Sequence, residues 1–418
     1  MFSALVSAWR IPELRKKLIY TLMMLAVFRL GSHIPVPGID KAVLSTMFQS
    51  DLFGWVDILS GGAFKNLTIF AMGIIPYINA SIITQLLTMV VPYFQRLQKE
   101  GQEGRKKMTQ IIRYGSVGLA LAQALVMSVY MQSAFVNPGA WSIVVCTVTL
   151  TAGATFLMWL GEQITDKGIG NGISLIIFAG IVSRLPAGIH TIWQYVATGE
   201  SSVFAVLLYA ILALLMIAGV VAVQEGQRRI TVQYSKRVIG RKVYGGQSTH
   251  IPMKINQAGV IPIIFAMALL TFPSVLANLF AANSKFAVWI ASVLNYQHPV
   301  YVICYALLIF VFTYIYTAAT FNTADVADNM RKNGGFIPGL RPGRPTAEYL
   351  DKVLSRLTFC GAAFLTLIAL MPSIFMAASG MNLYFGGTSL LIAVGVALDT
   401  MKQIESHLLM RHYQGFMK

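Results

Sequence analysis

The chain has 418 residues, of which 56% are hydrophobic and only 11% are charged, and its mean hydropathy is +0.66. A soluble globular domain is about 45–50% apolar and about 25% charged, so this composition excludes a water-soluble globule and a disordered chain. The net charge is nevertheless +16, from 32 Lys and Arg against 16 Asp and Glu. The composition therefore indicates a membrane protein, and the placement of its charges relative to the bilayer should reveal its orientation.

Ten apolar stretches are suited to crossing a membrane, because a bilayer core about 30 Å thick requires about 20 apolar residues per helix. The predicted spans are residues 18–34, 67–91, 114–134, 141–161, 172–188, 203–223, 257–280, 299–320, 357–377 and 385–401. No signal-peptide pattern is found at the N-terminus, so we retain the first stretch as a span.

The basic residues predict the orientation of these spans. If the N-terminus is cytosolic, the external connections are residues 35–66, 135–140, 189–202, 281–298 and 378–384. Three basic residues lie in these connections, at Lys41, Lys65 and Lys285, and two lie within spans, at Arg29 and Arg184. The other 27 of the 32 are then cytosolic, as the positive-inside rule requires. The pattern predicts a multi-pass protein with both termini in the cytosol.

Four of the spans are short or interrupted by glycine and proline. They are the second, fifth, seventh and tenth, and the breaks include Gly73, Pro76, Gly170, Gly172 and Pro262. Interrupted helices are tolerated at membrane depth where their backbone is buried in protein or lines a cavity, although Gly and Pro are also simply common in membrane helices. Four such spans, two in each half of the chain, favour a central pathway.

Two basic connections on the cytosolic side are longer than topology alone requires. Residues 224–256 alternate apolar and polar side chains around Val232 and Val238, which predicts a hairpin. Residues 321–356 contain a turn-rich tip that carries Arg341 and Arg344. We expect both loops to form docking surfaces for an acidic protein or for ribosomal RNA.

Motifs for catalysis are missing from the chain. It has no nucleotide-binding Gly-x-x-x-x-Gly-Lys-Ser/Thr loop, no His-Glu-x-x-His and no Gly-x-Ser-x-Gly elbow. The three cysteines lie singly inside apolar runs and predict neither disulfides nor a metal site. We therefore expect no enzyme, no cofactor and no metal. A secondary transporter for a small solute also has broken helices, but it would need a polar site at the midplane and no long docking loops.

The interrupted spans place isoleucine near mid-depth, where an ion-coupled transporter would keep ionisable residues. These isoleucines are Ile74, Ile78, Ile173, Ile177, Ile264 and Ile392. Isoleucine in a membrane helix usually faces lipid or packs against a neighbouring helix. If the six converge, however, they would form an apolar constriction that gates by dewetting.

Several ordered blocks of sequence resemble the SecY/Sec61-alpha family of protein-conducting channels, and in particular its Gram-positive bacterial forms. The blocks include FRLGSHIPVPGID at 28–40, GRKVYGGQSTHIPMKINQAGVIP at 240–262, FIPGLRPGRPT at 336–346 and YFGGTSLLIAVGVALD at 384–399. The resemblance implies an all-α polytopic membrane protein with ten helices around an hourglass pore. Its two inverted five-helix halves would be residues 1–188 and 189–418.

By the same resemblance, the six isoleucines form a pore ring, and a plug helix at about residues 52–64 seals the ring from outside. The plug residues would be Phe53, Val56, Leu59, Gly61 and Gly62. A lateral gate between the second and seventh spans would include Asn79, Gln85, Asn256 and Phe272. Arg341 would engage the SecA motor, and Arg241 and Lys242 the ribosome. Arg344 would belong to the same motor and ribosome docking surface.

The implied activity is passive translocation of unfolded secretory preproteins across the bacterial cytoplasmic membrane, with lateral release of hydrophobic segments into lipid. SecA or the ribosome would supply the driving force. The implied partners are SecE, SecG, SecA, the ribosome, the preprotein or signal peptide, and the lipid bilayer.

Overall fold

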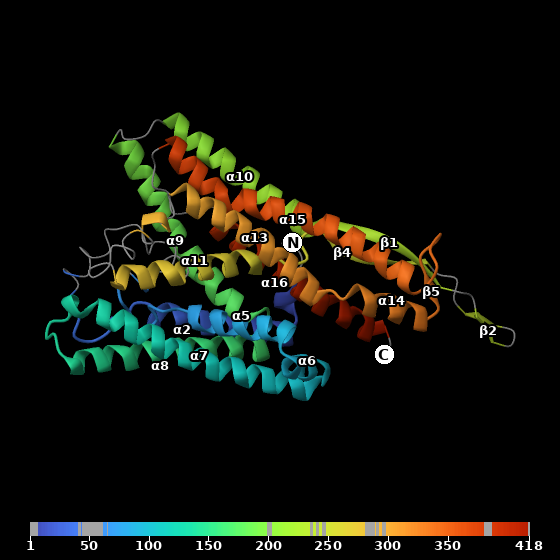
Figure 1. Cartoon of the computed structure of the whole chain (residues 1–418), viewed down its shortest axis with the longest axis horizontal. Coiled ribbons are helices and arrows are strands. Elements are labelled where there is room, and N and C mark those ends of the chain that lie inside the picture. Colours follow the sequence, from blue (N-terminus) through green and yellow to red (C-terminus); the bar gives the residue numbers. More distant parts are fainter. Residues whose placement is uncertain are drawn as a thin grey trace.

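The protein is mostly helical and elongated in the computed structural model (Figure 1). The structure describes residues 7–40, 43, 62–64, 66–198, 203–234, 237–239, 242–244, 248–280, 289, 292–294, 298–379 and 387–416. The longer helices are α2 (Pro12–Gly31), α5 (Ile75–Val90), α7 (Gln102–Tyr130), α8 (Ala140–Lys167), α9 (Gly172–Ala197), α10 (Val203–Glu225), α11 (Ile261–Phe280), α13 (Pro299–Thr320), α15 (Arg344–Ser379) and α16 (Gly387–Phe416). Each of the ten predicted spans coincides with one of these helices.

Six helices of the described chain, α7, α8, α9, α10, α13 and α15, are long and apolar enough to cross a bilayer. In α10 the apolar residues cover the whole surface, and its 23 residues extend about 35 Å at 1.5 Å per residue. Such a helix is stable only where lipid or other helices surround it. The coarse prediction of a multi-pass membrane protein is therefore confirmed.

Several predicted helix boundaries are wrong. The second span was expected to begin at residue 67, but α5 starts at Ile75, and residues 67–74 form buried turns with positive φ at Leu67 and Gly73. Other misses are extensions beyond the apolar stretch: α7 starts at Gln102, α9 continues through Pro186 to Ala197, α15 starts at Arg344 and α16 reaches Phe416. Hydropathy marks the part of a helix that meets lipid, whereas backbone hydrogen bonds continue the helix into water.

The helices pack in two groups. Within the first, α2, α5, α7, α8 and α9 contact one another, and within the second, α10, α11, α13, α15 and α16 do so. Among these helices the groups meet mainly where α9 packs against α10 and α16, and where α5 packs against α11. In Figure 1, α7 and α8 run along one edge of the molecule, and α10 and α15 run along the opposite edge.

The two long basic loops fold together at one end of the molecule. The predicted hairpin is confirmed: β1 (Gln227–Tyr234) pairs with β4 (Ser248–Lys254), and β2 (Arg237–Ile239) pairs with β3 (Lys242–Tyr244). A strand from the other loop, β5 (Gly335–Phe336), pairs with the far edge of β1, which gives the order β4-β1-β5. The all-α description therefore fails for this part of the chain.

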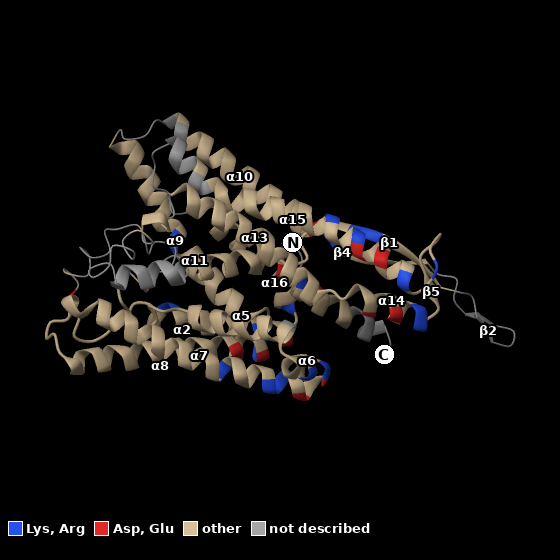
Figure 2. Ribbon diagram, in the orientation of Figure 1, with Lys and Arg blue, Asp and Glu red and all other residues tan. Residues whose placement is uncertain are grey.

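The sheet is covered by helix from the second loop. One face of β1 presents Ile230 and Val232, which are 5% and 1% exposed, to a core with Met330 of α14 (Thr323–Lys332) and with Leu350 at the start of α15. Figure 2 shows that Lys, Arg, Asp and Glu of the described chain gather at this end and around the short helix α6 (Pro92–Lys99). We call this part of the molecule the charged end.

Close approach of backbones fixes the packing between α8 and the turns before α5. A Cβ atom on Gly153 would overlap the carbonyl oxygen of Ile69. We expect Gly153→Ala to lower the free energy of unfolding by about 1–3 kcal/mol, because a backbone carbonyl cannot rotate away as a side chain can. Thermal unfolding of the purified protein in detergent measures the change.

Gly118 provides the matched control for this prediction. It lies in the interior of α7, and no atom beyond the adjacent backbone of that helix lies within 4 Å of the position that its Cβ would take. We expect Gly118→Ala to leave stability unchanged or to raise it by about 0.5–1 kcal/mol, because alanine loses less conformational entropy in a helix. Equal destabilisation by both substitutions would contradict the packing argument.

Candidate functional site

The six isoleucines singled out in the sequence lie against one apolar cluster in the middle of the molecule. Ile74, Ile177 and Ile392 are 5%, 6% and 2% exposed and belong to the buried part of this cluster. Ile78, Ile173 and Ile264 are partly buried and pack against it. We call the six together the isoleucine set. Helices from both packing groups contribute to it, so segments more than 300 residues apart in the sequence meet here.

Local backbone geometry places the members of the set. Ile74 caps the N-terminus of α5, and its carbonyl oxygen accepts a hydrogen bond of 3.0 Å from the amide of Ile78, so the two side chains are one turn apart. Ile173 is in the first turn of α9, where its Cδ1 lies 2.5 Å from the position of a Cβ on Gly161. A glycine at 161 therefore leaves the space that Ile173 occupies against α8.

The chemistry of the cluster is that of an apolar barrier. Its buried members are Phe, Leu, Ile, Val and Ala, and Tyr77 is among the partly buried residues that pack against them. No group of three or more metal-ligating side chains occurs among the described residues. A narrow apolar constriction in a membrane excludes ions, because water in it is unstable. The structure thus brings together residues able to form a gate, and their action as a pore ring stays a prediction.

Of the predicted lateral-gate residues, Asn79 and Gln85 lie on α5, and Asn256 lies just before α11. Asn79 and Gln85 are partly buried on α5. Asn256 is 6% exposed just before α11, and its Nδ2 donates a hydrogen bond of 3.1 Å to the carbonyl oxygen of Gly259. The side chain of Phe272 lies outside the described residues. The side chain of Gln85 lies near the hydroxyl of Tyr316 on α13, a neighbour that no sequence pattern indicated.

The predicted docking residues that the structure describes are exposed at the charged end. Arg341 lies in the loop between β5 and α15, where its carbonyl oxygen accepts a hydrogen bond of 2.9 Å from the buried Thr346 hydroxyl. Arg344 Nε lies 3.1 Å from Glu348 Oε1, one turn along α15. The backbone of Lys242 is in β3, whereas its side chain and all of Arg241 lie outside the described residues.

A family model described as SecY matches residues 68–401. The chain is 48% identical to the protein translocase subunit SecY of Halalkalibacterium halodurans, with 100% of both chains covered. It is 46% identical to the corresponding subunits of Streptomyces galbus and Bacillus licheniformis, again with both chains fully covered. The chain belongs to the SecY family.

Solved structures similar to this SecY-family chain share its fold. One is described as a protein conducting channel, with a TM-score of 0.65 and 18% identity over 94% of this chain and 92% of that one. Another is Sec61 in a canine ribosome-channel complex from the endoplasmic reticulum, with a TM-score of 0.63, 18% identity and the same coverage. A third is a SecY protein whose plug domain is reported to stabilise the closed state, with a TM-score of 0.66.

Most of the predicted plug lies outside the described residues, including Phe53, Val56, Leu59 and Gly61. Gly62 is described: its φ is +91°, and a Cβ there would come within 3.3 Å of the Arg184 guanidinium of α9. Its carbonyl oxygen accepts a hydrogen bond of 3.2 Å from Asn66 Nδ2. The end of the predicted plug segment thus requires a left-handed conformation, which favours glycine.

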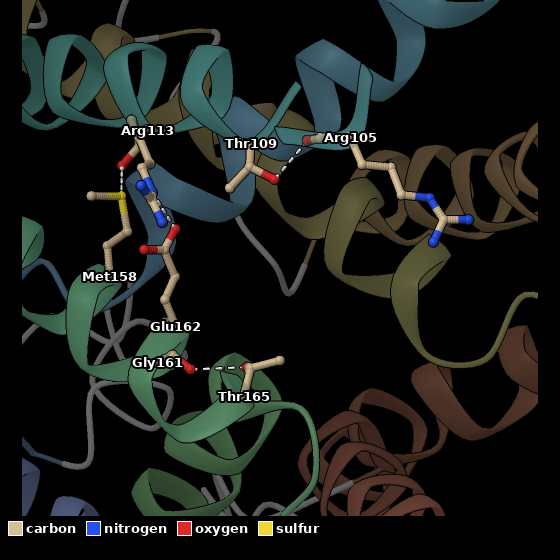
Figure 3. Close-up of polar contacts among 8 residues, drawn as sticks. Arg105, Thr109, Arg113, Met158, Gly161, Glu162 and Thr165 are labelled. Atoms are coloured by element: carbon tan, nitrogen blue, oxygen red, sulfur yellow. Dashed lines mark hydrogen bonds and ion pairs between the residues drawn. The ribbon is translucent and has the colours of Figure 1, made fainter. Parts of the chain in front are cut away.

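Polar contacts join α7 and α8 in this SecY-family chain, and no sequence pattern predicted them. Arg113 Nε lies 2.8 Å from Glu162 Oε1, and one turn further along α7 the Ser116 hydroxyl donates to Met158 Sδ at 3.3 Å (Figure 3). Glu162 lies in the block GEQITDK, and its charge next to an apolar stretch was the only sequence feature that could have indicated an ion pair. Its arginine partner is 49 residues away in sequence, so no local pattern could identify it.

Proposed function

We propose that this chain is the channel subunit of a bacterial Sec translocase, through which unfolded preproteins cross the cytoplasmic membrane. The observation that carries the proposal is the isoleucine set, since six isoleucines from four helices belong to or pack against one apolar cluster in a SecY-family chain. A passive apolar aperture can deform around a passing chain and close behind it. SecA or the ribosome supplies directionality, and the chain itself performs no catalysis.

In this proposal the ten long helices are all membrane spans, arranged as two inverted halves of five, residues 1–188 and 189–418. The two packing groups of helices support this division, because few contacts cross between them. The charged end faces the cytosol, as the positive-inside rule requires, so both termini are cytosolic. SecE and SecG accompany the channel as small subunits.

The lateral gate lies between α5 and α11. Helices α5 and α11 contact each other, and Gln85 and Asn256 are the polar residues that we assign to this seam. Hydrogen bonds between polar side chains in membranes are weak, about 0.6–2 kcal/mol each. A hydrophobic signal segment that partitions into lipid can therefore replace such contacts and open the seam. A transporter of small solutes would need a polar site at the midplane, whereas the interrupted spans contribute isoleucine to the central cluster.

The direct test is translocation of a preprotein into vesicles that contain this chain, its small subunits, the SecA motor and ATP. We expect protease-protected preprotein to accumulate in these vesicles. Vesicles that lack only this chain provide the control and should protect only background amounts. Equal protection with and without the chain would contradict the proposal.

A further inference from the structure

The turn between α8 and α9, residues 168–172, is held by side chains from three helices. The amide of Ile169 donates to Thr21 Oγ1 of α2 at 3.1 Å, that of Gly170 to Gln403 Oε1 of α16 at 3.0 Å, and that of Gly172 to Thr165 Oγ1 of α8 at 2.9 Å. Gly170 has a φ of +90°, and a Cβ there would lie 3.3 Å from Thr400 Oγ1. The turn therefore has one conformation, and α16 packs directly on its backbone.

The contact with Gln403 differs from the other two because it joins the two packing groups of helices. Thr21 and Thr165 belong to the group that contains the turn itself, whereas α16 belongs to the other. The adjacent side chains reinforce the junction: Ile169 and Ile404 are 3% and 2% exposed and share one apolar cluster. We call this hydrogen bond and the Ile169–Ile404 packing the α16 clasp.

The same turn of α16 is anchored to its own group. Lys402 Nζ lies 2.8 Å from Glu225 Oε1 at the end of α10. Consecutive side chains, Lys402 and Gln403, thus fasten α16 to α10 on one side and to the α8–α9 turn on the other. Movement of one group against the other at this turn would break the Gln403 hydrogen bond or the Lys402–Glu225 ion pair.

The clasp joins two helices that also carry half of the isoleucine set. α9 begins immediately after the clasped turn and carries Ile173 and Ile177, and α16 carries Ile392 eleven residues before Gln403. Eleven helical residues extend about 16 Å. The clasp therefore sets the relative position of the two helices that supply three of the six isoleucines.

We propose that Gln403 is a positioning residue that latches the two halves together at the cytosolic end and favours the closed isoleucine set, an inference that rests on the proposed function. Gln403 is exposed, so water can solvate its side chain when the latch opens. Gly170 is buried, so its amide lacks a partner unless the turn also moves into water. The exposed Gln403 side chain can therefore leave the turn, while the buried Gly170 amide favours the return to the closed contact.

The test compares Gln403→Leu, which removes the acceptor, with Gln403→Glu, which keeps an acceptor oxygen at the same reach. One ordinary hydrogen bond shifts a two-state equilibrium by about 2- to 12-fold. We expect Gln403→Leu to raise the ion conductance of the idle channel by about that factor and to admit preproteins with defective signal sequences. Gln403→Glu should behave as the unmodified channel.

Thr21→Val is the matched control, because it removes an equivalent hydrogen bond to the same turn from within one group. We expect it to leave conductance unchanged. Hydrogen exchange in the peptide that contains Gly170 supplies an independent readout: the rate should rise in Gln403→Leu and return to normal in Gln403→Glu.

The outcomes separate the clasp from the proposed pore ring. Unchanged exchange and conductance in Gln403→Leu, in a preparation where Ile177→Ser does leak, would overturn the clasp and leave the ring intact. Equal ion leak in Gln403→Leu and Gln403→Glu would show that loss of the hydrogen bond does not cause the leak. If Ile177→Ser does not leak, the ring itself fails, and the exchange measurement still decides the clasp.

Discussion

Replacing Ile78 and Ile177 together by serine is expected to raise the ion conductance of the idle channel at least about tenfold, because hydroxyl groups allow water to occupy an apolar constriction. The two residues come from α5 and α9 and face the same central cluster. The change should also relax selectivity for signal sequences, since a more weakly sealed channel opens more readily. Planar-bilayer recordings of the purified channel measure the conductance.

Ile176→Ser controls for general damage to the core. Ile176 is adjacent to Ile177 in α9, is 1% exposed and packs in the same cluster, but it is not a member of the isoleucine set. We expect Ile176→Ser to lower thermal stability with little leak. A leak equal to that of the double variant would show that any buried polar substitution opens the barrier, which would refute a specific ring.

Reversing the charge of Arg341 is expected to reduce SecA-driven translocation at least about tenfold while the melting temperature stays the same. The arginine side chain is exposed, and the backbone of its loop is held by Thr346 through a carbonyl oxygen, which any residue at 341 retains. Arg341→Glu therefore replaces a planar donor with an acceptor without disturbing the fold. ATP-dependent protection of preprotein in vesicles measures the effect.

Arg331→Glu is the control for net charge at the same end of the molecule. Arg331 lies on α14, its side chain is 59% exposed and its Nη2 lies 3.6 Å from Asp328 Oδ1. Arg331→Glu changes the net charge by the same amount as Arg341→Glu. We expect translocation to remain close to normal. Equal loss of translocation in both variants would indicate that SecA responds to the net charge of this end. A docking residue acts by direct contact, so its loss cannot be reproduced at another position.

The structure also changes how the two basic loops are understood. The sequence analysis treated them as separate surfaces, one for the motor and one for the ribosome. Pairing of β5 with β1 and the shared core around Val232 and Leu350 make them one folded unit. A partner that displaces one loop must therefore move the other. Sequence could not predict this, since a two-residue strand such as β5 carries no pattern of its own.

Hydropathy by itself determined where the helices are. Each predicted span coincides with a helix because burial of about 20 apolar residues in lipid is a local property of the chain. Helix ends were less predictable. α15 begins at Arg344, well before its apolar stretch, because packing of Leu350, Val353 and Leu354 on the sheet stabilises the extension. The irregular turns before α5 are likewise held by contacts with α8.

The sequence by itself determined the class of the protein, the partition of its charge and, through family resemblance, which isoleucines to examine. Only the tertiary structure decided that these six lie against one cluster and that Gln403 hydrogen-bonds the turn ahead of α9. The physical reason is sequence separation. Gly170 and Gln403 are 233 residues apart, and a hydrogen bond between them leaves no periodicity in either segment.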